Sequence, residues 1–275
     1  MLKKIMRFTK VEHTAFSLPL IFTGAWMGGG GQWPSLSLLL LIVAAAVGAR
    51  IFGMSFNRIF DRHIDARNPR TAGRELPSGT MGLPLALGVA MAGLGVYLGA
   101  CITLGPWCVY LSPVPLIPLL GYSLLKRFTC LCHFGIGLCL ALAPLGAFVA
   151  VSGHPRVSME VLLFSGFVFF WLSGADIIYA IMDIESDRYN GIHSIPARFG
   201  ASGAQWVSGG VHICALICMA VLLSSGRAGR PAMAAFAVTF LLFAMMYLPF
   251  VPVSKRFFPI STLAGIAGAV IPLLM

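Results

Sequence analysis

The chain contains a series of apolar runs, each close to the length that a helix needs to cross a lipid bilayer. About 20 apolar residues are enough for one crossing, and nine such runs cover most of the 275 residues. They are residues 14–31, 36–56, 83–104, 106–125, 131–151, 160–182, 204–224, 231–250 and 257–275. With 58% hydrophobic and 10% charged residues, the composition excludes a soluble or a disordered protein. We therefore expect an all-α membrane protein, in which nine transmembrane helices form one bundle and one domain over residues 1–275.

The basic residues are distributed unevenly between the two sides of this expected bundle. The chain has 19 Lys and Arg against 9 Asp and Glu. If the N-terminus is cytoplasmic, fifteen basic residues fall in cytoplasmic segments and three fall outside, namely Arg156, Arg227 and Arg230. This is the positive-inside pattern, which explains the basic excess without a nucleic-acid partner. We expect a multi-pass protein of the bacterial inner membrane, with cytoplasmic loops at about 57–82 and 183–203 that cover a central polar cavity.

Six of the nine acidic residues fall in two short clusters on the expected cytoplasmic side. Polar side chains recur there every four residues, as Asn57, Asp61 and Asp65 and again as Tyr179, Asp183 and Asp187. Three helical positions spaced by four fall within an arc of roughly 80°, so each set predicts one polar edge of a helix. Arg50 and Asp176 lie seven residues before Asn57 and Asp183, on the same faces and about 10 Å deeper.

The spacing of the two sets indicates an internal repeat and a metal site. Asp61 and Asp183 are 122 residues apart, as are Asp65 and Asp187, with four predicted spans between them. A carboxylate at the bilayer centre costs about 2.5–3.5 kcal/mol on the insertion scale, so we expect these groups at the interface or in a polar cavity. Two facing rows of carboxylates suit Mg²⁺ that bridges a diphosphate. Solvated helix ends, or a transporter of divalent cations or phosphorylated lipids, are the alternatives.

At these residues the chain resembles the UbiA superfamily of intramembrane prenyltransferases. The first family motif, Asn-x-x-x-Asp-x-x-x-Asp, is matched at 57–65, and the segment that follows it in the family is matched at 68–79. The second motif, Asp-x-x-Tyr-Ala-x-x-Asp-x-x-x-Asp, is matched at 176–187, and Lys126 with Arg127 resembles the family's Lys-Arg loop. The second motif is most similar to the 4-hydroxybenzoate polyprenyltransferase branch, including its relatives in the futalosine route to menaquinone. His133 departs from this pattern, which has Gln at that position.

The resemblance implies Mg²⁺-dependent transfer of a polyprenyl chain from its diphosphate to a hydroxylated aromatic acid, as in ubiquinone or menaquinone biosynthesis. The groups that it implies for metal binding and catalysis are Asn57, Asp61, Asp65, Asp183, Asp187 and Tyr179. Those that it implies for the diphosphate are Arg62, Arg70, Lys126 and Arg198, and those for the acceptor are Arg127, Arg50 and Asp176. The expected partners are thus a polyprenyl diphosphate, a small aromatic acid and the lipid bilayer. A dihydroxynaphthoate, haem, chlorin or glycerol phosphate acceptor is the alternative within the superfamily.

Overall fold

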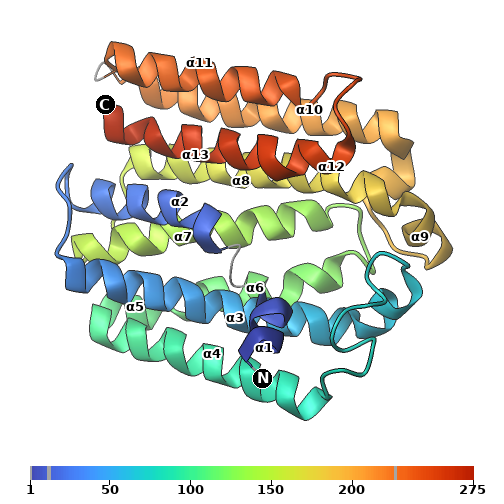
Figure 1. Cartoon of the computed structure of the whole chain (residues 1–275). Coiled ribbons are helices and arrows are strands. Elements are labelled where there is room, and N and C mark those ends of the chain that lie inside the picture. The colour runs from blue at the N-terminus through green and yellow to red at the C-terminus, as the bar shows by residue number, and fades with distance from the viewer. Residues whose placement is uncertain (1, 11–13, 226–227) are drawn as a thin grey trace.

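The structure is a computed structural model, which describes residues 2–10, 14–225 and 228–275. Within these ranges the chain forms helices and turns, with no strand. Most of the long helices lie side by side in one bundle (Figure 1). In chain order they are α1 (Leu2–Thr9), α2 (Thr14–Gly28), α3 (Leu36–Arg67), α4 (Leu83–Leu104), α5 (Pro106–Leu111), α6 (Pro113–Leu125), α7 (Cys132–Ser152), α8 (Met159–Tyr179), η2 (Ala180–Asp183), α9 (Ile184–Tyr189), α10 (Ile195–Leu223), α11 (Arg230–Met245), α12 (Val253–Lys255), η3 (Arg256–Ser261), α13 (Thr262–Val270) and η4 (Pro272–Leu274).

Helices occupy all nine runs that the sequence predicted to be membrane spans. In the described part of the chain, seven helical segments are long and apolar enough to cross a membrane. They are Leu36–Arg67, Leu83–Leu104, Pro106–Leu125, Cys132–Ser152, Met159–Tyr189, Ile195–Leu223 and Val253–Leu274. The other two, α2 and α11, have 15 and 16 residues. At 1.5 Å per residue they are about 22 and 24 Å long, which is short of the roughly 30 Å hydrocarbon core.

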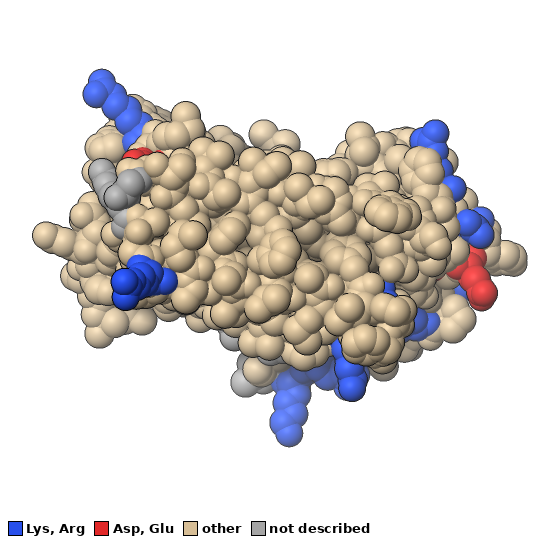
Figure 2. Space-filling view, turned by 90° about the horizontal axis from the view of Figure 1, so that it is seen from above, with Lys and Arg blue, Asp and Glu red and all other residues tan. Residues whose placement is uncertain are grey.

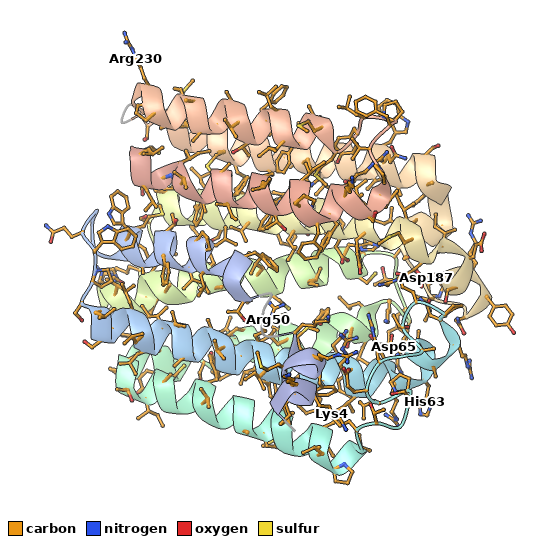
Figure 3. The ribbon with its side chains drawn as sticks, viewed as in Figure 1. Lys4, Arg50, His63, Asp65, Asp187 and Arg230 are labelled. Atoms are coloured by element: carbon orange, nitrogen blue, oxygen red, sulfur yellow. The ribbon has the colours of Figure 1, made fainter. Side chains whose placement is uncertain are left out.

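Charged side chains lie mainly at the two ends of the bundle. Seen from above, a broad band without Lys, Arg, Asp or Glu separates the ends, apart from a group of cations along one edge (Figure 2). Arg230 marks one end, and Asp65 and Asp187 lie toward the other (Figure 3). Arg227, which the positive-inside count assigned to an outer loop, lies outside the described residues. An uncharged band between two charged ends is the pattern of a protein that spans a membrane.

Both predicted covering loops are shorter than the sequence suggested, because helices continue into them. Helix α3 runs on to Arg67, so the first loop is reduced to residues 68–82. Helix α9 and the start of α10 occupy most of the second, which leaves residues 190–194. Both loops lie at the same end of the bundle (Figure 1).

Helix α8 forms the centre of the bundle and is the most buried of the membrane-spanning segments. Its buried rings Phe164, Phe167 and Trp171 stack along one face, with successive centroids 6.4 Å apart. The Trp171 Nε1–H donates to the carbonyl oxygen and the Oγ of Ser261, both at 2.9 Å. This central helix therefore holds the C-terminal helices against the rest of the bundle, and it carries Asp176 on its last turns.

Helices α3 and α4 pack with their backbones in close contact. A Cβ atom added to Gly48 would lie 2.6 Å from the Tyr97 nitrogen and 2.7 Å from the Gly93 oxygen. Small residues at such crossings allow the close packing that drives helix association in membranes. This contact supports the half of α3 that leads into Asn57, Asp61 and Asp65.

We predict that Gly48→Leu lowers the free energy of unfolding of the protein in detergent by about 1–3 kcal/mol, because the larger side chain would overpack against backbone atoms of α4. Gly95→Leu on α4 is the matched control, because nothing lies within 4 Å of a Cβ at that position. Thermal unfolding followed by size-exclusion chromatography measures both variants. Equal stability of the two variants would contradict the close contact between α3 and α4.

Candidate active site

A cavity of about 720 Å³, here called the main cavity, extends along the inside of the bundle. The end beneath the loops 68–82 and 190–194 is charged, with five acids and six cations among its lining residues. These are Asp61, Asp65, Asp176, Asp183 and Asp187, and Lys10, Arg50, Arg58, Arg70, Arg74 and Lys126. The other end reaches the α7–α8 turn and is lined by apolar residues such as Ile42, Leu104, Val149 and Val157. The cavity can therefore hold a molecule with an anionic head and a long apolar tail.

The two carboxylate clusters come together through the segment that follows α3. Asn68 Nδ2 donates to Asp183 Oδ1 at 2.8 Å, and Arg70 Nε donates to the same oxygen at 2.9 Å. Arg70 Nη1 also donates to the Tyr179 hydroxyl at 2.9 Å, and its guanidinium lies 5.0 Å from the centre of the Tyr179 ring. Burial alone would lower the pKa of Arg70, but hydrogen bonding and charge attraction from Asp183 raise it above its ordinary value. The first loop is thus bound to the second cluster by a charged contact.

The first row, Asn57, Asp61 and Asp65, lies on α3 as the spacing predicted. Asp61 Oδ2 accepts hydrogen bonds from Lys126 Nζ at 2.7 Å and from Asn57 Nδ2 at 3.1 Å. Both oxygens of Asp65 accept from Arg74 Nη1, at 2.7 and 2.8 Å. The two aspartates are buried, and each is neutralised by a cation from outside α3.

The second row does not lie on one continuous α-helix. Helix α8 ends at Tyr179, and the 3₁₀ turn η2 carries the chain through Asp183 to α9. A 3₁₀ turn has three residues per turn instead of 3.6, which rotates Asp183 away from the direction expected for an uninterrupted helix. Arg70 still reaches both Tyr179 and Asp183, while Asp187 Oδ2 accepts from Ser194 Oγ at 2.8 Å. The expected single edge is wrong in geometry, but its three residues all line the main cavity.

The donor groups of both rows suit a hard divalent cation, since they are carboxylate and amide oxygens. Asp61 Oδ1 is buried and, in the described structure, has no hydrogen-bond partner. A buried carboxylate oxygen without a partner is costly, and a cation ligand would satisfy it. Among the described residues, no three His, Cys, Asp or Glu side chains are close enough to hold a metal ion together. The row residues fit Mg²⁺ in chemistry, although Asp183 and Asp65 here accept hydrogen bonds from Arg70 and Arg74.

His133 holds Asp176 and the start of α10 in place. The Ile195 N–H donates to His133 Nε2 at 3.3 Å, so this nitrogen carries the lone pair. The proton is therefore on Nδ1, which donates to Asp176 Oδ2 at 2.7 Å. His133 is 2% exposed, so its contact with the Ile195 N–H is shielded from water, while the Asp176 carboxylate is partly exposed. Gln, which the resemblance implied here, also has one donor and one acceptor on a planar group, and the departure leaves the interaction pattern intact.

Three of the predicted anion-binding arginines do not line the main cavity. Arg62 Nη1 donates to the Ile59 carbonyl at 2.9 Å, and Arg127 Nη2 donates to the Phe60 carbonyl at 2.6 Å. Both line a separate pocket. Arg198 lies over the Phe199 ring, with its centre 5.3 Å away. The geometry thus places none of these three against the carboxylates, whereas Arg50, Arg70 and Lys126 line the main cavity as expected.

Two further arginines, for which the sequence predicted no role, also line the main cavity. Arg58 is 5% exposed, and its Nη1 lies 4.0 Å from Asp65 Oδ2. Its Nε is buried and has no hydrogen-bond partner among the described residues. Arg74 contacts the same carboxylate from the first loop. The predicted span ended at residue 56, so Arg58 was assigned to the first loop; it is buried because α3 continues to Arg67.

The chain is similar to a family model and to proteins of known name. The model described as the UbiA prenyltransferase family matches residues 17–256. A 4-hydroxybenzoate octaprenyltransferase of Serratia proteamaculans is 31% identical over 196 residues, which cover 71% of this chain and 67% of the relative. The mitochondrial 4-hydroxybenzoate polyprenyltransferase of Caenorhabditis elegans is 28% identical over 190 residues, which cover 69% of this chain and 53% of the relative.

Solved structures of the same family resemble the whole fold. The apo structure of a UbiA homolog from Aeropyrum pernix K1 aligns with a TM-score of 0.81 and 33% identity, over 95% of this chain and 96% of that one. A UbiA homolog from Archaeoglobus fulgidus bound to GPP and Mg²⁺ aligns with a TM-score of 0.68 and 22% identity, over 98% of this chain and 99% of that one. The second likeness concerns the fold alone.

We predict that His133→Ala lowers the free energy of unfolding by about 1–3 kcal/mol, because it removes the hydrogen-bond partner of the buried Ile195 N–H and of the partly buried Asp176 carboxylate. His133→Gln restores a donor and an acceptor and should retain most of the stability. Thermal unfolding of both variants in detergent tests this. If Gln destabilises as much as Ala, the two hydrogen bonds of His133 do not support the fold.

Proposed function

The chain belongs to the UbiA prenyltransferase family, and from this membership we propose that it transfers a polyprenyl chain from a polyprenyl diphosphate to a small hydroxylated aromatic acid. The proposed acceptor is 4-hydroxybenzoate or a close relative, the cofactor is Mg²⁺, and the product is a precursor of ubiquinone or menaquinone. The observation that carries the proposal is the main cavity, whose charged end holds both carboxylate rows and whose other end is apolar. Such a cavity matches a diphosphate head and an isoprenoid tail.

The diphosphate is proposed to bind between the two rows, beneath the first loop. Asn57, Asp61, Asp65, Asp183 and Asp187 would hold Mg²⁺. The chemistry that bound Mg²⁺ supplies is neutralisation of the diphosphate charge as the allylic C–O bond breaks. Residues of the chain then act at the head group, because Lys126, Arg70 and Arg74 already contact the same carboxylates and can donate to the phosphoryl oxygens.

The acceptor is proposed to bind deeper in the cavity, next to the breaking bond. Arg50 and Asp176 both line the cavity there, and Arg50 lies nearer the middle of the bundle than Asp65 (Figure 3). A guanidinium pairs with a carboxylate in two places, so Arg50 suits the acid group of the ring. Asp176, held by His133, suits its hydroxyl. The Tyr179 ring, close to Asp183 through Arg70, would face the allylic carbocation with its electron-rich surface.

The proposed topology has the N-terminus and the active site on the cytoplasmic side of a bacterial inner membrane. Nine crossings follow if the two short apolar helices, α2 and α11, also span the bilayer, which a locally thinner bilayer permits. The positive-inside count supports this orientation. Cysteine labelling of residue 156 from the periplasmic side and of residue 67 from the cytoplasmic side would test it.

We predict that the protein in membranes transfers radiolabelled geranyl diphosphate to 4-hydroxybenzoate only when Mg²⁺ is present, and that EDTA abolishes the transfer. Asp61→Asn and Asp183→Asn should each reduce the rate by at least about 100-fold, because each removes a carboxylate that would hold the Mg²⁺ needed to neutralise the leaving diphosphate. Glu185→Gln is the matched control, since this acid is exposed and does not line the main cavity. It should retain activity.

A parallel reaction with a dihydroxynaphthoate identifies the acceptor branch. Transfer to the naphthoate alone would keep the chemistry and replace the proposed acceptor. Hydrolysis of the donor without transfer to either ring would leave the diphosphate site and reject both acceptors. Unchanged transfer by Asp61→Asn and Asp183→Asn would contradict the roles proposed for the two rows.

A further inference from the structure

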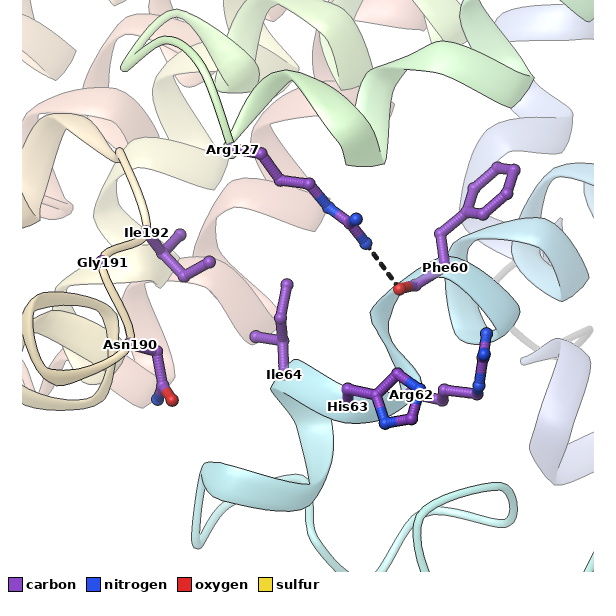
Figure 4. Close-up of a pocket in the computed structure, with 8 residues that line it drawn as sticks. All are labelled: Phe60, Arg62, His63, Ile64, Arg127, Asn190, Gly191 and Ile192. Carbon is purple, nitrogen blue, oxygen red and sulfur yellow. Dashed lines mark hydrogen bonds between the residues drawn. The ribbon is translucent and has the colours of Figure 1, made fainter.

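A second pocket, here called the outer pocket, lies beside the main cavity near the second loop. It has a volume of about 430 Å³ (Figure 4). Its lining residues are Phe60, Arg62, His63, Ile64, Arg127, Asn190, Gly191 and Ile192. Neither the carboxylate rows nor Arg50 line it, so this pocket is distinct from the site described above.

The outer pocket and the main cavity are separated by a thin wall. Neighbouring residues face opposite sides of this wall, since Asp61 and Lys126 line the main cavity and Arg62 and Arg127 line the outer pocket. Ile64 and Ile192 line both spaces. The side chains of these two isoleucines face one another in Figure 4. A ligand in the outer pocket is thus separated from the main cavity, in part, by two aliphatic side chains.

Backbone hydrogen bonds hold the rest of this wall in place. The His193 N–H donates to the Lys126 carbonyl at 2.7 Å, and the Ile192 N–H donates to the Asp187 carbonyl at 2.8 Å. The second loop is therefore tied both to the turn that carries Arg127 and to α9. Rotation of the Ile64 and Ile192 side chains would leave these backbone hydrogen bonds in place.

The lining of the outer pocket selects for small anions with an apolar body. Arg62 and Arg127 each donate to one backbone carbonyl, and no Asp or Glu lines the pocket among the described residues. Their positive charges are therefore not neutralised by a carboxylate within the pocket. A planar guanidinium binds a carboxylate in two places, while Phe60, Ile64 and Ile192 offer apolar walls to a ring. Inorganic diphosphate would gain nothing from those walls.

We propose that the outer pocket is an antechamber for the acceptor, where Arg127, assisted by Arg62, captures an aromatic carboxylate before it passes Ile64 and Ile192 into the main cavity. This inference rests on the proposed function for its acceptor. It differs from the role that the sequence suggested for Arg127, because the arginine here acts before the reaction and does not contact the reacting ring. No bond is made or broken in this step.

The test compares Arg127→Gln and Arg62→Gln with Arg67→Gln, a matched control that removes an exposed cation of α3 lining neither space. Steady-state kinetics on the full-length protein in nanodiscs should show the acceptor KM for 4-hydroxybenzoate raised about 5-fold or more by Arg127→Gln. The kcat and the donor KM should stay within about 2-fold, because the antechamber is empty when the bond breaks. With the neutral analogue 4-hydroxybenzamide, Arg127→Gln should have no effect on the acceptor KM.

A fall in kcat as large as the rise in KM would overturn the antechamber, since it would place Arg127 at the reacting ring. An equal rise in the KM for the amide would mean that Arg127 has only a structural role. An unchanged KM for 4-hydroxybenzoate would mean that Arg127 does not capture the acceptor. Saturation-transfer NMR without donor or Mg²⁺ covers the case in which no transfer is found. Binding of 4-hydroxybenzoate that Arg127→Gln abolishes and inorganic diphosphate does not displace would keep the site, while the proposed reaction fails. Displacement by diphosphate would assign the pocket to that anion and overturn the proposal.

Discussion

Placing five carboxylates at one end of an apolar bundle, two of them buried and three partly buried, is the constraint on which the other features of this site depend. An isolated buried charge costs several kcal/mol, and a buried pair is tolerated only when its hydrogen bonds are satisfied. Each aspartate accordingly has a partner from another element or another turn of the chain. The partners are Lys126 for Asp61, Arg74 for Asp65, His133 for Asp176, Arg70 for Asp183 and Ser194 for Asp187. These contacts tie the first loop, the turn after α6 and the start of α10 to one another across the cavity mouth.

The same contacts determine how the site would respond to the proposed ligands, a diphosphate and Mg²⁺. Six cations and five aspartates line the main cavity, so its charges nearly balance before anything binds. A diphosphate head without a metal ion would upset this balance, and so would a metal ion without the diphosphate. Arg70 and Arg74 can transfer their hydrogen bonds from carboxylate to phosphoryl oxygens, which frees Asp183 and Asp65 for the cation. Donor and metal binding should therefore be coupled through these two arginines, with Asp61 Oδ1 already available.

The sequence predicted the features that depend on periodicity and composition. The nine apolar runs are helical, and Asn57, Asp61 and Asp65 share an edge of α3 because that helix continues past the apolar run. It did not predict where α-helical geometry stops. The 3₁₀ turn at Ala180–Asp183 depends on contacts with the first loop that are distant in sequence. Nor could it predict that Asn68 and Arg70 would cross to Asp183, since a loop's path is set by the partners that it finds.

Helix geometry explains why Arg62 and Arg127 do not line the main cavity. Adjacent residues on a helix point about 100° apart, so a helix that turns Asp61 into the main cavity turns Arg62 away from it. The turn after α6 separates Lys126 from Arg127 in the same way, with one side chain on Asp61 and the other on the Phe60 carbonyl. A motif that places an acid and a base side by side therefore encodes two surfaces instead of one. Here the second surface is the outer pocket, whose two arginines donate to backbone carbonyls while Asp61 and Lys126 line the main cavity.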